Sequence, residues 1–297
     1  MATGITISST SNLASHQRIV FAEARFALQY KEIMTNLVTN FTLPPGAKQL
    51  TVPKYSALTA SGLTEGVDMT APQQLASSVV DVTTSEVGIM VTVSRKLVRQ
   101  QVEDIFRVVG RLLSDSLAKK EDQDGLSQLD SFSKSISASN AVLTLAHLRG
   151  AVAYISTGGT SGQPGPEPIV FVLHPEQLAD IVTHILGANT TYGSGAVAVP
   201  AGISEDLTKN YHRGNLPVYG TPIFVDGNIT VDSDGDAKGG AFSKMALMFT
   251  RSQEWLIDTQ HDASLRADEM VLTTEYSWDE YEDNWGVELY SDASTTI

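Results

Sequence analysis

Four carboxylates near the C-terminus form a dense group of potentially reactive side chains. They stand among aromatic residues, in the order Trp278, Asp279, Glu280, Tyr281, Glu282, Asp283 and, after one asparagine, Trp285. Paired carboxylates beside aromatic rings are what glycosidases use to cleave sugars. Adjacent acids in one polar stretch are more typical of a solvated loop between strands, with the aromatic rings packed beneath it. We favour the loop and predict no catalytic residue here.

A second acidic group has the alternation of a calcium loop. Asp232, Asp234 and Asp236 are spaced as the first ligands of an EF-hand. The sixth position of such a loop would then be Ala237 instead of glycine, and the twelfth would be Ser243 instead of glutamate. The pattern therefore favours a solvent-facing hairpin turn over a metal site.

No serine has the surroundings of an activated nucleophile. A nucleophile elbow needs glycine two residues before and two residues after the serine. Ser161 has Gly159 before it but Gln163 after it, and Ser194 has Tyr192 before it. Neither serine fits.

The glycine-rich stretch at residues 193–198 resembles a dinucleotide-binding fingerprint only superficially. That fingerprint lies between a strand and a helix, whereas Pro200 and Gly202 follow this stretch at once. A phosphate-binding P-loop with its lysine is absent from the sequence. We predict a linker here and no cofactor.

The histidines and cysteines give no metal site. The chain has no cysteine, which excludes disulfides, thiolate ligands and a cysteine nucleophile. No two histidines have the HExxH spacing of a zinc protease, and each is expected to be a helix cap or a surface residue. The six are His16, His147, His174, His184, His212 and His261. The sequence thus predicts no catalytic, cofactor-binding or metal-binding residue.

The net charge limits the possible partners. The formal charge is −14, from 34 acidic and 20 basic residues, and such a field repels nucleic-acid phosphates. Specific recognition of DNA or RNA is disfavoured, but enclosing nucleic acid is compatible with this charge. No apolar run is long enough to span a membrane, and the N-terminus lacks the pattern of a secretory signal. We expect a soluble protein made in the cytoplasm.

Two elements at the N-terminal end expose apolar surface. Residues 15–41 carry Ile19, Phe26 and Tyr30 at helical spacing, which predicts an amphipathic arm helix that ends before Pro44. Residues 48–93 then hold two β-like tracts, the second alternating from Val87 to Val93. We expect these tracts to form a long hairpin around the polar residues 56–74. Since a lone hairpin is marginally stable, it should lean on another subunit.

A long helix follows, from Arg95 to about Asp124, with Ser94 as N-cap and Gly125 as its stop. Its expected apolar positions are Val98, Val102, Ile105, Phe106, Val109, Leu112, Leu113 and Leu117. A single structural helix is favoured over a coiled coil, because the heptads are not sustained.

The remainder reads as an α/β unit followed by strands. A helix near residues 145–155 precedes the apolar run at residues 169–173, which predicts a buried central strand. His174-Pro175-Glu176 then opens a second helix. A flexible stretch, a short polar helix and two short β-like pieces are expected over residues 188–226. Later strands are expected at residues 245–249, 255–257, 270–278 and 287–290.

This order of elements resembles that of the major capsid proteins of tailed bacteriophages, with the Hong Kong 97-type α+β fold. Four local sequences contribute to the resemblance: PIVFVLHP at residues 168–175, GNLPVYGTPI at 214–223, GAFSK at 240–244 and WGVEL at 285–289. The resemblance implies five regions. They are an N-arm at 1–46, an extended β-hairpin loop at 47–93, a peripheral domain with a spine helix at 94–135, an axial domain at 136–242 and a β-rich return to the peripheral domain at 243–297.

The resemblance also implies a function. The chain would be a non-enzymatic structural protein that self-assembles as hexamers and pentamers into an icosahedral shell around phage double-stranded DNA. It would reside in the virion after assembly in the host cytoplasm, with possible scaffold, portal and decoration partners. Because the chain starts almost at the arm, a separate scaffold protein or none is implied. Some family members crosslink a loop lysine, but Lys48 and Lys54 give no basis for assigning that chemistry.

Two alternatives remain open at this stage. An encapsulin-like nanocompartment has the same fold and holds cargo enzymes in place of a genome. A soluble α/β enzyme with an unrecognised site is the other alternative.

Overall fold

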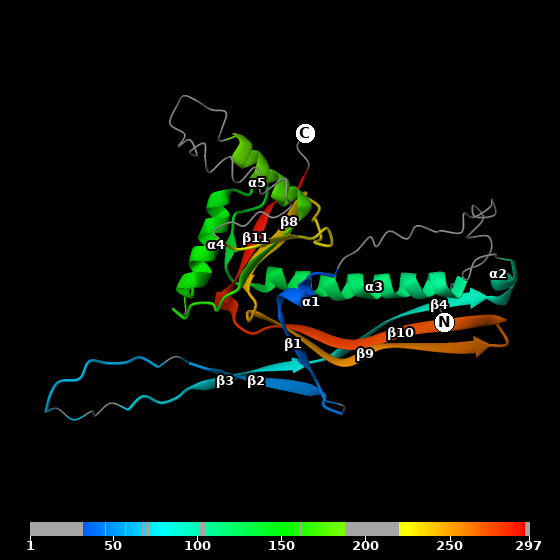
Figure 1. The fold of residues 1–297 in the computed structure, drawn as a ribbon, viewed down its shortest axis with the longest axis horizontal. Helices are drawn as coiled ribbons and strands as arrows, with labels where there is room; N and C mark the ends of the chain where they lie inside the picture. The colour runs from blue at the N-terminus through cyan, green and yellow to red at the C-terminus, as the bar shows by residue number, and fades with distance from the viewer. Residues whose placement is uncertain are drawn as a thin grey trace.

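The computed structural model describes residues 32–44, 46–56, 58–66, 68, 72–100, 105–160, 162–187 and 220–294, and of 183–187 the backbone alone. Three sheets organise this part of the chain: a long four-stranded sheet, a five-stranded sheet and a two-stranded hairpin. Figure 1 shows the five-stranded sheet with its helices above one end of the long sheet, and the hairpin projecting sideways. The expected α+β class is confirmed.

The long sheet has the strand order β1-β9-β10-β4. Its members are β1 (Thr39–Thr42), β9 (Leu247–Asp262), β10 (Ala267–Glu280) and β4 (Ser85–Ser94). One face of β4 packs on helix α3 (Ile105–Ser127) through Val87, Ile89, Val91 and Val93. The alternation in the sequence therefore marks a real apolar face, as predicted. The strands predicted at 245–249 and 255–257 are one continuous strand, β9.

The expected pairing of the two N-terminal β tracts is wrong. β2 (Gln49–Tyr55) pairs with β3 (Ser77–Thr83), with Tyr55 opposite Ser77. The tract from Val87 to Val93 pairs instead with β10, and Val91 stands opposite Met270. This second tract is thus covered by its own subunit. Packing on α3 and pairing with β10 bury its apolar face, which a lone two-stranded hairpin would leave exposed to water.

Helix α3 extends along the length of the long sheet, and its sheet-facing residues Ile105, Val109, Leu113 and Leu117 are buried. The short helix α2 (Arg95–Gln100) precedes it, and Leu97 donates its backbone N–H to Ser94 Oγ at 3.3 Å. Ser94 is therefore the predicted N-cap. Val102 lies outside the described residues.

Two expectations for this helix are wrong. Leu112 is 49% exposed, because it lies on the flank of the helix away from the apolar face. Gly125 does not stop the helix, which continues to Ser127. A Cβ atom at Gly125 would lie 2.8 Å from the Trp278 ring, so close packing explains the glycine.

The predicted arm helix is shorter at its C-terminal end than expected. Within the described part of this segment, residues 32–41, the helix covers Met34–Leu37 (α1), and Phe41 lies in β1, which pairs in parallel with β9. Pairing with β1 satisfies backbone N–H and C=O groups of β9. A continued helix would leave those groups of β9 unpaired. Residues 1–31 of the predicted arm lie outside the described residues.

The five-stranded sheet has the order β5-β11-β8-β6-β7. Its strands are β5 (Ser135–Ile136), β11 (Gly286–Asp292), β8 (Asp236–Ser243), β6 (Ile169–Leu173) and β7 (Ile223–Val225). All five residues of β6 are buried, which confirms the predicted interior strand. Helices α4 (Leu145–Thr157) and α5 (Pro175–Gly187) were both predicted, and buried residues of both lie in the same apolar cluster as Phe171.

The C-terminal segment contributes to both large sheets, since β9 and β10 belong to the long one and β11 to the five-stranded one. The boundaries of the five regions stay a prediction. Residues 188–219, which include the predicted polar helix, lie outside the described residues. None of the described helices combines the length with the apolar composition that a transmembrane helix requires.

Candidate assembly surface

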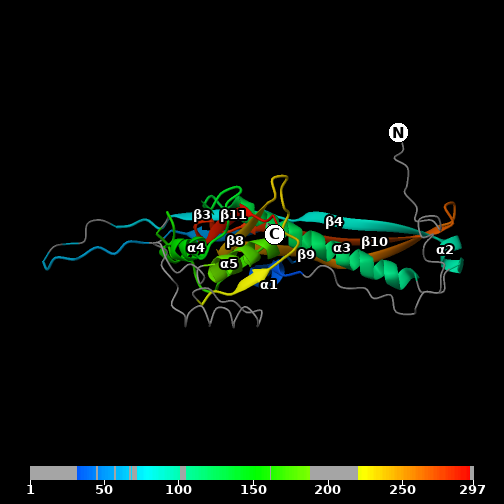
Figure 2. The ribbon, with the colours of Figure 1, turned by 90° about the horizontal axis from the view of Figure 1, so that it is seen from above.

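The β2–β3 hairpin presents apolar side chains without cover from the rest of the described chain. It extends away from both large sheets in two perpendicular views (Figures 1 and 2). Leu63 in the connecting segment is 73% exposed. The other exposed apolar residues are Tyr55, Leu58, Leu75 and Val79. A two-stranded ribbon of this kind gains stability only when another surface covers it.

The hairpin is fastened to its own subunit near Lys54. The Lys54 ammonium forms an ion pair with Glu282, whose side chain is 6% exposed. Tyr281 donates its hydroxyl to the Pro53 carbonyl at 3.4 Å. Burial raises the pKa of Glu282, but the bonds from Lys54 and Asn284 outweigh this and hold that pKa below its ordinary value. These contacts fix where the hairpin leaves the body.

The C-terminal acids are therefore not the solvated loop that the sequence predicts. Glu282 is buried under the hairpin, and burial raises the pKa of half-buried Asp279 and Glu280. Both of the latter belong to the end of β10. The aromatic part of the prediction is correct for Trp278, which is 6% exposed and packs on Phe249 with ring centroids 4.7 Å apart.

The alternating aspartates form a turn, but not an entirely solvent-facing one. Asp232 Oδ1 accepts the backbone N–H groups of Asp234 at 3.0 Å and Asp236 at 2.9 Å. Asp236 is buried and accepts a bond from Ser139 Oγ at 2.6 Å. Its carboxylate also accepts the Asn140 backbone N–H at 3.0 Å. These bonds organise the turn from inside. Among the described residues, no group of acids and histidines could hold a metal ion.

Two histidines cap helices, as expected. His174 Nδ1 accepts the backbone N–H of Glu176 at the start of α5, at 3.3 Å. His147 Nδ1 accepts the backbone N–H of Thr144 at the start of α4, also at 3.3 Å. His261 Nδ1 lies 2.7 Å from Asp268 Oδ1 on the neighbouring strand. The side chains of the other three histidines lie outside the described residues.

The serine and glycine motifs are not placed by the structure. Ser161, Ser194 and the glycine-rich stretch at 193–198 all lie outside the described residues. The linker assigned to that stretch stays a prediction.

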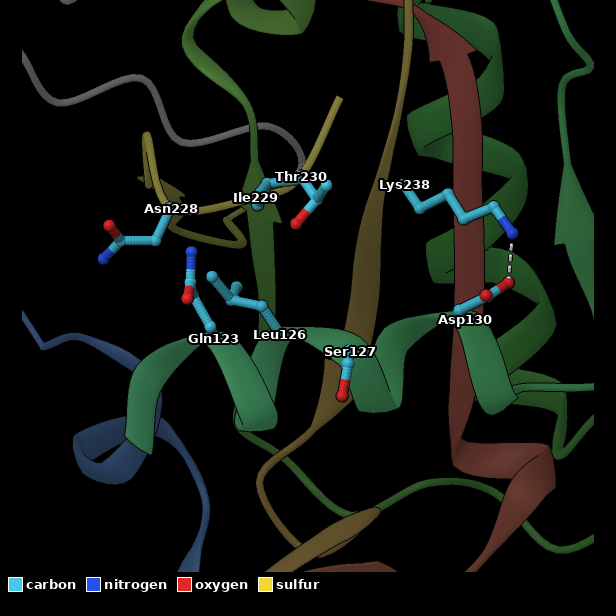
Figure 3. Close-up of a pocket in the computed structure, with 8 residues that line it drawn as sticks. All are labelled: Gln123, Leu126, Ser127, Asp130, Asn228, Ile229, Thr230 and Lys238. Atoms are coloured by element: carbon cyan, nitrogen blue, oxygen red, sulfur yellow. Dashed lines mark hydrogen bonds and ion pairs between the residues drawn. The ribbon is translucent and has the colours of Figure 1, made fainter. Parts of the chain in front are cut away.

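A cavity of about 160 Å³ lies between the end of α3 and the loop after β7 (Figure 3). Its polar lining includes Lys238, whose ammonium is bonded to Asp130 and lies 3.7 Å from Glu288. The bond to Asp130 raises the pKa of Lys238. Lys238 is the one cationic side chain among the described lining residues, and two carboxylates already lie beside it, so it is not free to bind an anionic ligand.

A buried polar junction joins the arm, α3 and the loop after β7. Asp122 is fully buried, and its Oδ1 accepts the backbone N–H groups of Ile33 at 2.9 Å and Met34 at 3.1 Å. Its Oδ2 accepts the Asn228 side-chain amide at 2.8 Å. Asp226 lies beside it, and burial and the neighbouring Asp122 raise its pKa to about 7. Sequence reasoning missed this junction, since Asp226 and Asn228 indicate only a turn.

A second buried acid connects α3 to β9. Glu121 is fully buried and accepts bonds from Arg251 Nη2 at 2.7 Å and Trp255 Nε1 at 2.8 Å. Burial raises the pKa of Glu121, although both donors oppose the shift. The buried acids Asp122 and Glu121 thus connect elements that are distant in the sequence, and neither is among the residues that line the cavity in Figure 3.

Solved structures show what this arrangement is similar to. The capsid of the Helicobacter pylori bacteriophage KHP30 superposes with a TM-score of 0.73 at 12% identity, covering 98% of this chain and all of that chain. A Mycobacterium phage Che8 chain superposes with a TM-score of 0.70 at 13% identity, covering 91% of this chain and 95% of that chain. The SrpI encapsulin of Synechococcus elongatus gives 0.65 at 10% identity, covering 99% of both chains. The sequence matches no known family model and no curated protein.

The chain has the Hong Kong 97-type fold. The coverage extends over nearly the whole chain, so the likeness includes the hairpin, the long helix and both large sheets. The fold expected from the sequence is confirmed. The projecting hairpin carries several of the exposed apolar side chains of the described residues.

Proposed function

We propose that this chain is the major capsid protein of a tailed bacteriophage. Copies assemble as hexamers and pentamers into an icosahedral shell around double-stranded DNA, without a catalytic role. The observation that supports this most strongly is the exposed apolar hairpin on a Hong Kong 97-type fold. Identical copies can cover each other's hairpins, and many modest contacts of this kind add up to a stable shell.

The charge of the chain fits such a container. A formal charge of −14 disfavours tight binding of the enclosed DNA, because phosphate binding relies on clustered lysine and arginine. The proposed location is the virion, with assembly in the host cytoplasm. Scaffold, portal and decoration proteins are further proposed partners, which act on the shell as a whole.

An encapsulin-like compartment is the second candidate, because the SrpI encapsulin covers 99% of the chain. Its TM-score of 0.65 is below the 0.73 of the KHP30 capsid, which favours the phage capsid. The content of particles isolated from the native source separates the two. Nuclease-resistant double-stranded DNA inside the particles supports a capsid, and an enclosed protein without DNA supports a compartment. A soluble enzyme would give no particles at all.

A further inference from the structure

One flank of the long sheet leaves large apolar side chains uncovered beside α3. Trp255 is 36% exposed and Ile257 is 51% exposed. Trp255 lies on the α3 side of β9, because its indole N–H bonds to Glu121. Ile257 stands opposite Leu272, which is fully buried under α3, and so shares that side. Leu256 alternates to the other face of the sheet.

The side of α3 that carries Glu121 also carries two small residues, Gly110 and Ser114. Ser114 and Gly110 precede Glu121 by seven and eleven residues, which places them on the same side of the helix two and three turns away. A Cβ atom at Gly110 would meet nothing within 4 Å. Glu121, on this side of α3, binds the Trp255 indole, so we group Gly110 and Ser114 with the exposed Trp255 and Ile257 and name this surface the α3–β9 flank.

The N-terminal segment leaves the described structure next to this flank. The backbone N–H groups of Ile33 and Met34 bond to Asp122, the residue after Glu121. The Glu32 carboxylate lies close enough to Glu121 to help raise the pKa of that acid. The chain that precedes Glu32 therefore starts beside the partner of Trp255.

We propose that residues 15–31 dock as an amphipathic helix on the α3–β9 flank of the same chain. The 17 residues would form a helix of about 25 Å, the same length as α3 between Glu121 and Ile105. Ile19, Phe26 and Tyr30 recur at helical spacing and would face Trp255 and Ile257. This inference concerns one subunit and stands independently of the proposed function.

Disulfide trapping tests the docking directly, because the native chain has no cysteine. The full chain carrying Phe26→Cys and Ile257→Cys is oxidised and separated on a non-reducing gel. The expected result is an intrachain disulfide, seen as a monomer band of altered mobility and as a linked peptide by mass spectrometry. Ala24→Cys with Ile257→Cys is the matched control, since Ala24 faces away from the stripe. Phe26→Cys with Leu256→Cys is the second control, on the opposite face of the sheet.

Limited proteolysis gives a test that leaves the arm unchanged. Trypsin cleavage after Arg18, Arg25 and Lys31 is followed in the wild type and in Ile257→Asp, with Leu256→Asp as control. Ile257→Asp should speed cleavage by about tenfold or more, the factor expected when one large aliphatic contact is lost. Equal rates in the two variants would overturn the proposal. So would trapping no stronger than in the controls, or an interchain disulfide, which would place the arm on a neighbouring subunit.

Discussion

Asn228 donates its side-chain amide to Asp122 Oδ2 at 2.8 Å, and this bond connects the loop after β7 to α3. Asp122 also holds the backbone of Ile33 and Met34. One buried carboxylate thus joins three segments that are far apart in the sequence. The neighbouring Asp226 Oδ2 is buried and has no hydrogen-bond partner in the part of the chain that the structure describes. The junction therefore contains two acids at close quarters, which makes it sensitive to protonation.

Asp226→Asn should remove a pH dependence of stability. The folded pKa of Asp226 is about 7, raised from 3.8 by burial and by Asp122. Between about pH 4 and pH 7 the carboxyl is protonated in the folded state but ionised in the unfolded state. The free energy of unfolding therefore falls as pH rises through this range. Between pH 5 and pH 8 the free energy of unfolding of the wild type should fall by about 2–3 kcal/mol more than that of the variant. Denaturant titrations at both pH values measure this. Parallel pH profiles for the two proteins would refute the assignment.

Glu121→Ala should destabilise the subunit strongly. The substitution leaves Arg251 and the Trp255 indole without their buried acceptor, a loss of about 3–5 kcal/mol in the free energy of unfolding. Glu254→Ala is the matched control. Its side chain is 83% exposed and lies 3.6 Å from the same arginine, so it should change stability by less than about 1 kcal/mol. Similar losses for both variants would contradict the buried role of Glu121.

Gly125→Ala should destabilise α3 although alanine favours helices. The new methyl would lie 2.8 Å from the Trp278 ring, which is buried and cannot easily move. A loss of about 1–3 kcal/mol is expected from this overpacking. Gly110→Ala on the same helix would meet nothing within 4 Å among the described residues, so it lacks the ring contact and should cost less than Gly125→Ala. Chemical denaturation measures both, and a stabilising Gly125→Ala would show that the ring contact is not limiting.

The outcome at Gly125 illustrates what sequence alone can and cannot give. Local signals were reliable: the apolar run Ile169–Leu173 is a buried strand, and Ser94 caps α2. A glycine can end a helix or allow close packing, however, and the sequence does not distinguish the two roles. At Gly125 the position of the Trp278 ring does. Neighbours that are distant in the sequence decide such cases.

Pairing across long distances was the other source of error. The alternation from Val87 to Val93 predicts a strand with one apolar face, but it does not say which strand lies beside it. The partner is β10, about 180 residues later, and the hairpin closes with β3 instead. For the same reason Asp122, Glu121 and Glu282 could not be identified as buried acids. Their partners Asn228, Arg251 and Lys54 are remote in the sequence.

Lys54→Met should loosen the base of the hairpin. It removes the cation paired with buried Glu282, and an unpaired buried carboxylate costs about 1–3 kcal/mol. The pKa of Glu282 should rise as a result. Lys48→Met, at an exposed position before β2, is the control and should change stability by less than about 0.5 kcal/mol. Hydrogen exchange at β2 and β3 reports the loosening. Unchanged exchange in Lys54→Met would mean that this ion pair does not hold the hairpin.

Deleting residues 56–74 should leave a folded subunit that assembles poorly. The segment projects from the body and contributes exposed Leu58 and Leu63, so its contacts are proposed to lie between subunits. Circular dichroism and thermal unfolding should match the wild type, while the yield of particles falls. An unfolded deletion variant would show that the segment stabilises its own subunit.

Electron microscopy of the purified full-length chain, together with its size-exclusion profile, tests the central proposal most directly. The exposed hairpin on a Hong Kong 97-type fold predicts capsomers and closed particles of uniform size. A compact monomer that stays single at high protein concentration, with no particles in the micrographs, would contradict the proposal.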